Sequence, residues 1–222
     1  MRIKNLILTT GWLCCAAVSA SAQQIAIQNQ YGKYASEKTT INVSGSPYLT
    51  DDWAAATIKM KSGLMVKEKV KYDLLDDILY FKTTDGKFMT FAEPVSEFRI
   101  EEGSGAGLYR NNYDNSRFGS KTTFYQVLFD GKVKLLKRMN KGVNDVMEYN
   151  AASPTKTITQ KVRYYAVSVD GTFVEVKPAK KDILNIMNAK KVEVDKFLSS
   201  SHIDFKADAD LVTLFTYYNS LV

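Results

Sequence analysis

The chain has almost no cysteine or histidine, the residues on which much catalytic and metal chemistry depends. Its 222 residues include two cysteines, Cys14 and Cys15, and one histidine, His202. Both cysteines lie in a leading segment that we expect to be removed, which leaves no disulfide, no thiolate nucleophile and no cysteine metal ligand. A lone histidine is usually a surface or packing residue. Neither an ordinary catalytic triad nor a histidine-rich metal site can be built around it without unusual partners.

The sequence also lacks a cofactor motif. The run Gly103-Ser104-Gly105-Ala106-Gly107 resembles a phosphate-binding loop only superficially. It has no lysine followed by serine or threonine, and no parallel strand-to-helix unit surrounds it, so we interpret it as a flexible connector. No spaced run of aspartates indicates a calcium loop. We therefore expect no cofactor and no metal ion.

The first 22 residues are typical of a secretory signal. Arg2 and Lys4 precede an apolar stretch over 6–18, and Ala20-Ser21-Ala22 supplies small residues for cleavage before Gln23. A membrane-spanning helix needs about 20 apolar residues, more than this stretch offers. We predict export to the periplasm or cell envelope, with no transmembrane segment after cleavage. The alternatives are a retained anchor and a lipoprotein modified at Cys14 or Cys15. The second is disfavoured because Leu13, which is not small, precedes Cys14.

The charge of the processed chain is only mildly positive. Removing Arg2 and Lys4 leaves 28 basic residues against 24 acidic ones. The lysines are spread along the chain, mostly one strand position apart, which is typical of a solvated sheet face. A nucleic-acid groove needs a basic cluster interleaved with stacking aromatic rings. We therefore expect no nucleic-acid partner.

Four turn signals divide the middle of the chain into hairpins. Asp-Gly pairs between strand-like runs predict type I′ turns, in which both central residues have positive φ. They occur at Asp85-Gly86, Asp130-Gly131 and Asp170-Gly171, and Ser62-Gly63 predicts a fourth hairpin.

The runs between these turns alternate as strands do. In 64–74 the apolar side holds Leu64, Val66, Val70, Tyr72 and Leu74, opposite Met65, Lys67, Lys69, Lys71 and Asp73. In 133–139 the pattern places Leu135 on the dry side and Leu136 on the wet side. One dry face and one wet face indicate an antiparallel sheet. We predict a mainly-β (α+β) fold, an antiparallel meander that forms a curved sheet or partly open barrel.

The period changes to that of helices after Pro178. Apolar residues at helical spacing predict short C-terminal α-helices that pack on the sheet, the clearest stripe being Leu211, Leu214, Phe215, Tyr218 and Val222. Asp208 and Asp210 at its start can cap free amides. We expect a single β-rich domain over 23–222, with 178–222 as its helical segment. The polar stretches 101–121 and 140–160 are predicted long loops.

The best candidate site is a loop that carries aromatic residues and arginines. Aromatic rings and arginine on a loop are typical of recognition surfaces. The residues are Tyr109, Arg110, Tyr113, Arg117 and Phe118. They predict contact with a ligand or a partner. The alternative is that Tyr109 and Phe118 simply anchor the loop to the sheet.

Paired carboxylates offer the only candidate hydrolytic chemistry. The pairs are Asp51-Asp52, Asp76-Asp77 and Glu101-Glu102. A glycosidase needs two carboxyl groups about 5–10 Å apart across a cleft. Neighbouring residues of a strand point to opposite faces, so turn chemistry and solvation of strand ends explain these pairs more simply.

Three segments resemble a known group of proteins. They are residues 123–137 (TFYQVLFDGKVKLLK), residues 210–219 and the sequence Gly-Ser-Pro-Tyr-Leu at 45–49. Together they resemble uncharacterised exported proteins of Bacteroidetes-type Gram-negative bacteria. This resemblance implies a periplasmic or cell-envelope location and carries no assigned activity.

The leading functional hypothesis is a non-enzymatic exported envelope protein that binds a small ligand or a protein partner. A concave sheet with a helical cover suits an apolar or glycan ligand. The alternatives are a carboxylate-dependent hydrolase of envelope polymers and a structural or adaptor protein of the cell envelope.

Overall fold

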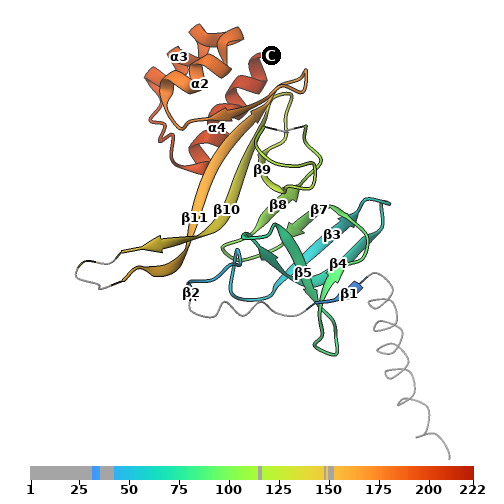
Figure 1. The fold of residues 1–222 in the computed structure, drawn as a ribbon. Helices are drawn as coiled ribbons and strands as arrows, with labels where there is room; N and C mark the ends of the chain where they lie inside the picture. The colour runs from blue at the N-terminus through green and yellow to red at the C-terminus, as the bar shows by residue number, and fades with distance from the viewer. Residues whose placement is uncertain (1–31, 36–42, 115–116, 148, 150–152) are drawn as a thin grey trace, which may run out of the picture.

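The computed structural model shows one open twelve-stranded sheet with short helices at its C-terminal end (Figure 1). It describes residues 32–35, 43–114, 117–147, 149 and 153–222. The mainly-β antiparallel fold with C-terminal α-helices is therefore confirmed. The predicted signal segment, Cys14 and Cys15 lie outside the described residues.

The strands divide into two meanders. Their bounds are β1 Gly32–Tyr34, β2 Val43–Ser44, β3 Ala54–Met60, β4 Met65–Asp73, β5 Ile78–Lys82, β6 Phe88–Phe91, β7 Val95–Ile100, β8 Gly107–Arg110, β9 Tyr125–Phe129, β10 Lys134–Val146, β11 Thr155–Val167 and β12 Phe173–Val176. Their order in the sheet is β1-β6-β5-β4-β3-β7-β8-β9-β10-β11-β12, and β2 pairs with β11. We call β3–β8 the first meander and β9–β12 the second meander. Among the described strands, three pairings join strands that are not consecutive: β1 with β6, β3 with β7, and β2 with β11.

All four predicted hairpins are present, but the type I′ turns expected at Asp85-Gly86, Asp130-Gly131 and Asp170-Gly171 are not, because none of these pairs has positive φ at both residues. Gly86 has φ +85°, whereas Asp85 is not among the described residues with positive φ. Gly86 N–H donates to the Thr83 carbonyl (2.9 Å), and Thr83 N–H donates to the Lys87 carbonyl (3.0 Å). This is a type I turn followed by a glycine bulge, in which the third loop residue takes the left-handed conformation and the aspartate avoids it. Equivalent bonds form at Gly63 and Gly171.

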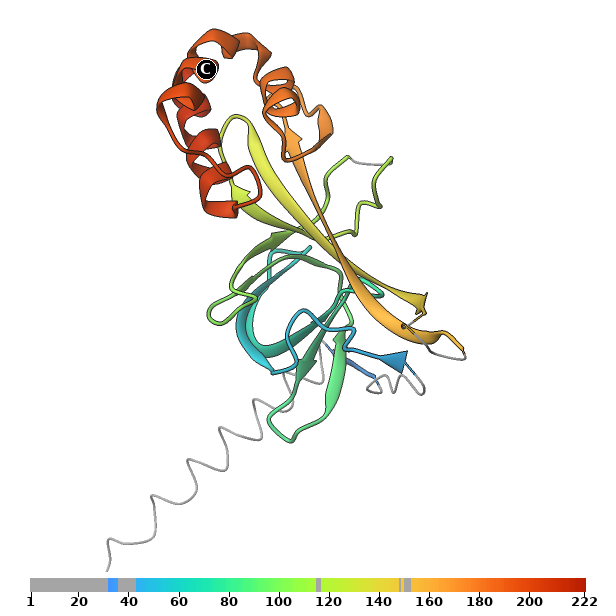
Figure 2. The ribbon, with the colours of Figure 1, turned by 90° about the vertical axis from the view of Figure 1, so that its left-hand side faces the viewer.

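The first meander curls around its own core (Figure 2). The inward side chains of β3–β8 are almost fully buried, among them Ile58, Met60, Phe81 and Phe98. The centre of this core is aromatic. The ring of Tyr72 lies edge-on to three other rings, those of Phe98 (5.3 Å), Tyr109 (5.8 Å) and Phe124 (6.0 Å).

A long two-stranded arm replaces the loop predicted over 140–160. β10 and β11 pair in unbroken register from Lys134↔Val167 to Val146↔Thr155. The sequence did not reveal these strands because it lacks apolar alternation here. Both faces of the outer arm meet water, so no such alternation is required. Lys141 joins the arm to the first meander. Its N–H donates to the Leu74 carbonyl (2.9 Å), and its Nζ donates to the Ser46 (2.9 Å) and Tyr48 (2.6 Å) carbonyls.

The helices cover one face of the second meander. They are α2 Lys180–Ile186, α3 Lys191–Ser200 and α4 Asp208–Leu221, with a 3₁₀ turn, η1, at Asn188–Lys190. Their inward residues have no exposed surface and pack on Leu135, Ala166 and Val176 of the strands. These inward residues are Ile183, Met187, Val194, Leu211, Leu214 and Phe215.

Asp208 does not cap its helix as expected. No side chain caps the start of α4, although both aspartates lie in its first turn. Instead Asp208 accepts hydrogen bonds from Lys137 Nζ (2.6 Å) and Tyr164 OH (2.8 Å). Its carboxylate therefore fixes the helix to the sheet and still meets the positive end of the helix dipole.

The opposite face of the second meander is covered as well, by a segment that we call the strap, residues 111–114 and 117–124. Leu136, predicted to face water, has no exposed surface and lies in a cluster with Tyr125 and Tyr165. Tyr113 and Phe118 of the strap pack against this cluster. The prediction was wrong for Leu136 because a local alternation pattern cannot reveal a cover supplied by a distant loop.

Substitutions of Gly171, in the turn between β11 and β12, test the glycine bulge. Gly171 has φ +82°, and no atom lies near enough to obstruct a side chain there. We expect Gly171→Ala to lower the free energy of unfolding by about 1–2 kcal/mol, because an L-residue with a β-carbon is strained in this conformation. Gly171→Asn should cost clearly less, since asparagine tolerates it. Urea denaturation of both variants measures the difference. Equal losses would contradict this turn geometry.

Candidate functional site

The five residues of the predicted site do not form one open surface. Tyr109 lies on β8 and is 1% exposed. Its hydroxyl donates to the Gly105 carbonyl (2.9 Å), and its ring stacks on Phe98 at 4.7 Å. Tyr109 therefore belongs to the first core.

Arg110, the next residue of β8, is held by two carboxylates. Its Nε lies 2.6 Å from Glu97 Oε2, and its Nη1 lies 2.8 Å from Asp130 Oδ2. Although partial burial opposes ionisation, hydrogen bonds from Lys134 and Arg110 lower the pKa of Asp130. These ion pairs join β7, β8 and the β9–β10 turn.

The remaining three predicted residues lie in the strap. The ring of Tyr113 contacts Tyr125 (5.7 Å), and that of Phe118 contacts Tyr165 (5.3 Å). Arg117 is exposed, with its guanidinium 5.5 Å from the Phe118 ring centre. The anchoring alternative thus accounts for the packing of the aromatic residues. A role of these five residues in binding stays a prediction.

A different site lies on the outer face of the first meander. An open cleft of about 970 Å³ runs over β3, β4 and β5 to the β5–β6 turn. Three lysines from neighbouring strands line it, Lys67, Lys69 and Lys82, and we call this cleft the lysine trough. Its other lining residues are Ala55, Ala56, Thr57, Glu68, Thr83, Thr84, Asp85, Gly86 and Glu101.

Strand register brings these lysines together. Lys69 of β4 lies directly opposite Lys82 of β5 and, on its other side, opposite Ala55 of β3. Lys67 lies opposite Thr57. Like charges at directly opposite positions of a sheet are destabilising. The fold therefore tolerates a small electrostatic cost at this cleft.

The trough lysines lack acidic partners. In the part of the chain that the structure describes, no salt bridge forms to Lys67, Lys69 or Lys82. Two of the carboxylates in the lining are already engaged. Glu101 accepts a hydrogen bond from Thr57 Oγ1 (2.9 Å), and Asp85 pairs with Lys87 (2.8 Å).

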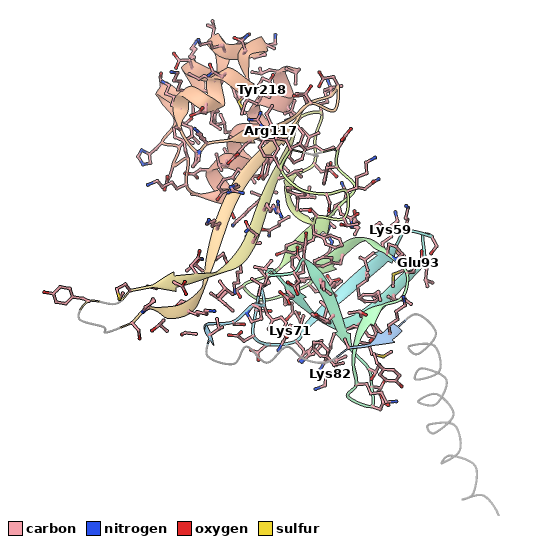
Figure 3. The ribbon with its side chains drawn as sticks, viewed as in Figure 1. Lys59, Lys71, Lys82, Glu93, Arg117 and Tyr218 are labelled. Atoms are coloured by element: carbon pink, nitrogen blue, oxygen red, sulfur yellow. The ribbon has the colours of Figure 1, made fainter. Side chains whose placement is uncertain are left out.

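An aromatic group borders the trough. Lys82 Nζ lies 5.9 Å from the Trp53 ring centre, and the neighbouring Lys71 lies 5.4 Å from it and 4.7 Å from Tyr48. Trp53 also meets Phe88 edge-on at 5.4 Å. Figure 3 shows Lys71 and Lys82 at the same end of the first meander, with Lys59 farther along β3. The alternating Lys67-x-Lys69-x-Lys71 was the signal for this surface, but only the register shows that Lys82 joins it.

A second polar group lies at the β4–β5 turn. Asp77 has φ +61°, and its carboxylate accepts hydrogen bonds from Tyr72 OH and Phe124 N–H (3.5 Å). Partial burial raises the pKa of Asp77. The hydrogen bonds and the nearby positive charge of Arg138 lower this pKa, but burial has the larger effect. Burial, with the adjacent Asp77 charge, raises the pKa of Tyr72 well above its usual value. This group joins the first core to the end of the strap.

Other chemistry has little support among the described residues. They contain no group of three or more histidine, cysteine, aspartate and glutamate side chains that could hold a metal ion. None of their helices is long and apolar enough to cross a membrane. His202 is exposed on the helical segment.

No family model, curated protein or solved structure significantly matches this chain. The chain's own residues are therefore the guide to its function.

The ionisation of Asp77 gives a test by pH. Because its pKa is raised in the folded chain, the stability that Asp77 contributes is fully present below its unfolded pKa of 3.8 and is lost as pH rises through the folded value. Asparagine keeps an oxygen acceptor and tolerates positive φ. We expect Asp77→Asn to become more stable relative to the wild type as pH rises from about 4 to about 7.

Urea midpoints of both proteins across this range measure the effect, with Asp52→Asn, at an exposed position, as the control. A difference between Asp77→Asn and wild type that does not change with pH would contradict the assignment.

Proposed function

We propose that this chain is a non-enzymatic exported envelope protein that binds an acidic carbohydrate in the lysine trough. The observation that carries the proposal is the meeting of Lys67, Lys69 and Lys82 at an open cleft, where none of them has a salt bridge to a described residue. A ligand with carboxylate or sulfate groups would offset the repulsion between Lys69 and Lys82, because each ammonium group can donate to an anionic oxygen. Export is supported by the leading segment of the sequence.

The mixed lining favours a carbohydrate over a polyphosphate. Thr57 and Thr84 supply hydroxyl groups beside the lysines, and Glu101, which binds Thr57 through Oε1, supplies a carboxylate. Sugar hydroxyls can donate to carboxylates, whereas closely spaced phosphates would be repelled by them. An acidic sugar matches both kinds of lining group.

The arrangement of the helices favours an external site over an enclosed one. Ile183, Leu214 and Phe215 fill the space between helices and sheet with side chains that have no exposed surface. An apolar ligand at that position would have to displace them. The lysine trough, by contrast, is open to solvent and needs no rearrangement of the core.

Neither alternative function has a specific observation in its favour. A hydrolase needs two carboxyl groups that converge on a substrate. In the trough, Glu101 and Asp85 are engaged by Thr57 and by Lys87. An adaptor role would need a partner surface, which the trough does not indicate.

The variant Lys69→Gln/Lys82→Gln separates binding from stability. Removing the facing charges should raise the free energy of unfolding by about 0.2–1 kcal/mol. It should also weaken binding of alginate, an acidic polysaccharide, about tenfold, because two exposed ion pairs are lost. Isothermal titration calorimetry measures the affinity, and urea denaturation measures the stability.

Lys161→Gln, at an exposed lysine on the arm, is the matched control and should leave both quantities unchanged. Neutral dextran should not bind. If single-stranded DNA bound as tightly as alginate, the carbohydrate assignment would be overturned, and equal affinities of wild type and double variant would overturn the trough itself.

A further inference from the structure

A second basic cleft lies on the helical cover. It has a volume of about 440 Å³ and lies on the outward side of α2 and the start of α3. The residues that line it are Lys180, Lys181, Leu184, Asn185 and Lys191. It combines ammonium groups with the apolar side chain of Leu184, a lining that suits a ligand with anionic and apolar parts.

The surrounding segment has an excess of positive charge. Residues 177–196 contain six lysines, against Asp182, Glu193 and Asp195. Lys180 pairs with Asp195 (2.8 Å), and Lys190 lies 3.8 Å from Glu193. Within the described chain, Lys181 and Lys191 have no salt bridge. These two lysines are therefore available to an external anion.

An exposed apolar side chain follows one of the lining lysines in the sequence. Val192 follows Lys191 at the start of α3 and is 79% exposed. On the other side of these helices, Ile183, Met187 and Val194 have no exposed surface. The buried side fixes the orientation of α2 and α3, so Val192 and the lysines are presented outward together.

We propose that this surface, which we call the helical tip (Lys180, Lys181, Leu184, Lys191 and Val192), docks on an anionic phospholipid surface. Each lysine close to an anionic lipid surface contributes about 1 kcal/mol of attraction. The exposed Val192 can enter the head-group region while the ammonium groups meet the phosphates. Charge complementarity and the apolar edge favour this partner over a free soluble anion, which would gain nothing from Val192.

The position of the helical tip suits such docking. The helices lie at one end of the molecule and β1–β6 at the other, with β10 and β11 extending between them (Figures 1 and 2). A chain docked by the helical tip would keep the lysine trough away from the lipid. The docking does not depend on the proposed function of the trough.

Vesicle sedimentation tests the proposal with the chain from Gln23 to Val222, because the apolar leader would itself partition into lipid. Binding should be seen on vesicles of phosphatidylcholine mixed with phosphatidylglycerol, should weaken with added salt, and should be absent on phosphatidylcholine alone. Lys181→Gln/Lys191→Gln should lower the partition coefficient about thirtyfold. Val192→Asp should also lower it.

The matched control is Lys156→Gln/Lys161→Gln at two exposed positions of the arm, which removes the same charge and should bind vesicles like the wild type. Equal loss in both double variants would show a net-charge effect and overturn the helical tip as the docking surface. So would absence of binding to the mixed vesicles, an unchanged partition of Val192→Asp, or complete displacement by inorganic phosphate at matched ionic strength.

Discussion

The rest of the structure depends on the burial of both faces of the second meander. Leu135 and Leu136 are consecutive residues of β10, and neither has any exposed surface. Neighbouring residues of a strand point to opposite faces, so each leucine needs a cover of its own. The helices supply one cover and the strap supplies the other. Short helices that would be marginal alone are stabilised by this packing, since burying an apolar side chain contributes about 1.5–3 kcal/mol.

The first meander satisfies a weaker constraint, which leaves one of its faces available for binding. Its inward side chains form a core of their own, and its outer face meets water at Lys67, Lys69 and Lys82 but is buried at Lys71 and Asp73, which the sequence pattern placed on the wet side. Exposed residues on that outer face can change without loss of packing. Three lysines meet there, although the repulsion between the facing Lys69 and Lys82 lowers stability. A purely structural surface would avoid this pair. Two-sided burial would have excluded such a cluster from the second meander.

Features that depend on adjacent residues could be predicted from the sequence, and features that depend on distant partners could not. Asp-Gly pairs located the hairpins, and the stripe at Leu211, Leu214 and Phe215 predicted α4. The burial of Leu136 could not be predicted because it depends on a cover supplied by the strap. The lysine trough could not be predicted because the meeting of Lys69 and Lys82 depends on the register between β4 and β5. The predicted site was placed on a loop whose aromatic residues are needed for packing.

Polar contacts hold the two meanders together where the sheet is narrowest. β8 and β9 pair at only two positions, Tyr109↔Gln126 and Arg110↔Tyr125. Asp77 adds a bond from the first meander to the end of the strap, and Lys141 joins the arm to two backbone carbonyls. A buried polar group that loses its partner costs about 1–3 kcal/mol, so these contacts favour one relative orientation of the meanders. That orientation keeps the lysine trough and the helical tip at opposite ends, so a ligand at either proposed site would not obstruct the other.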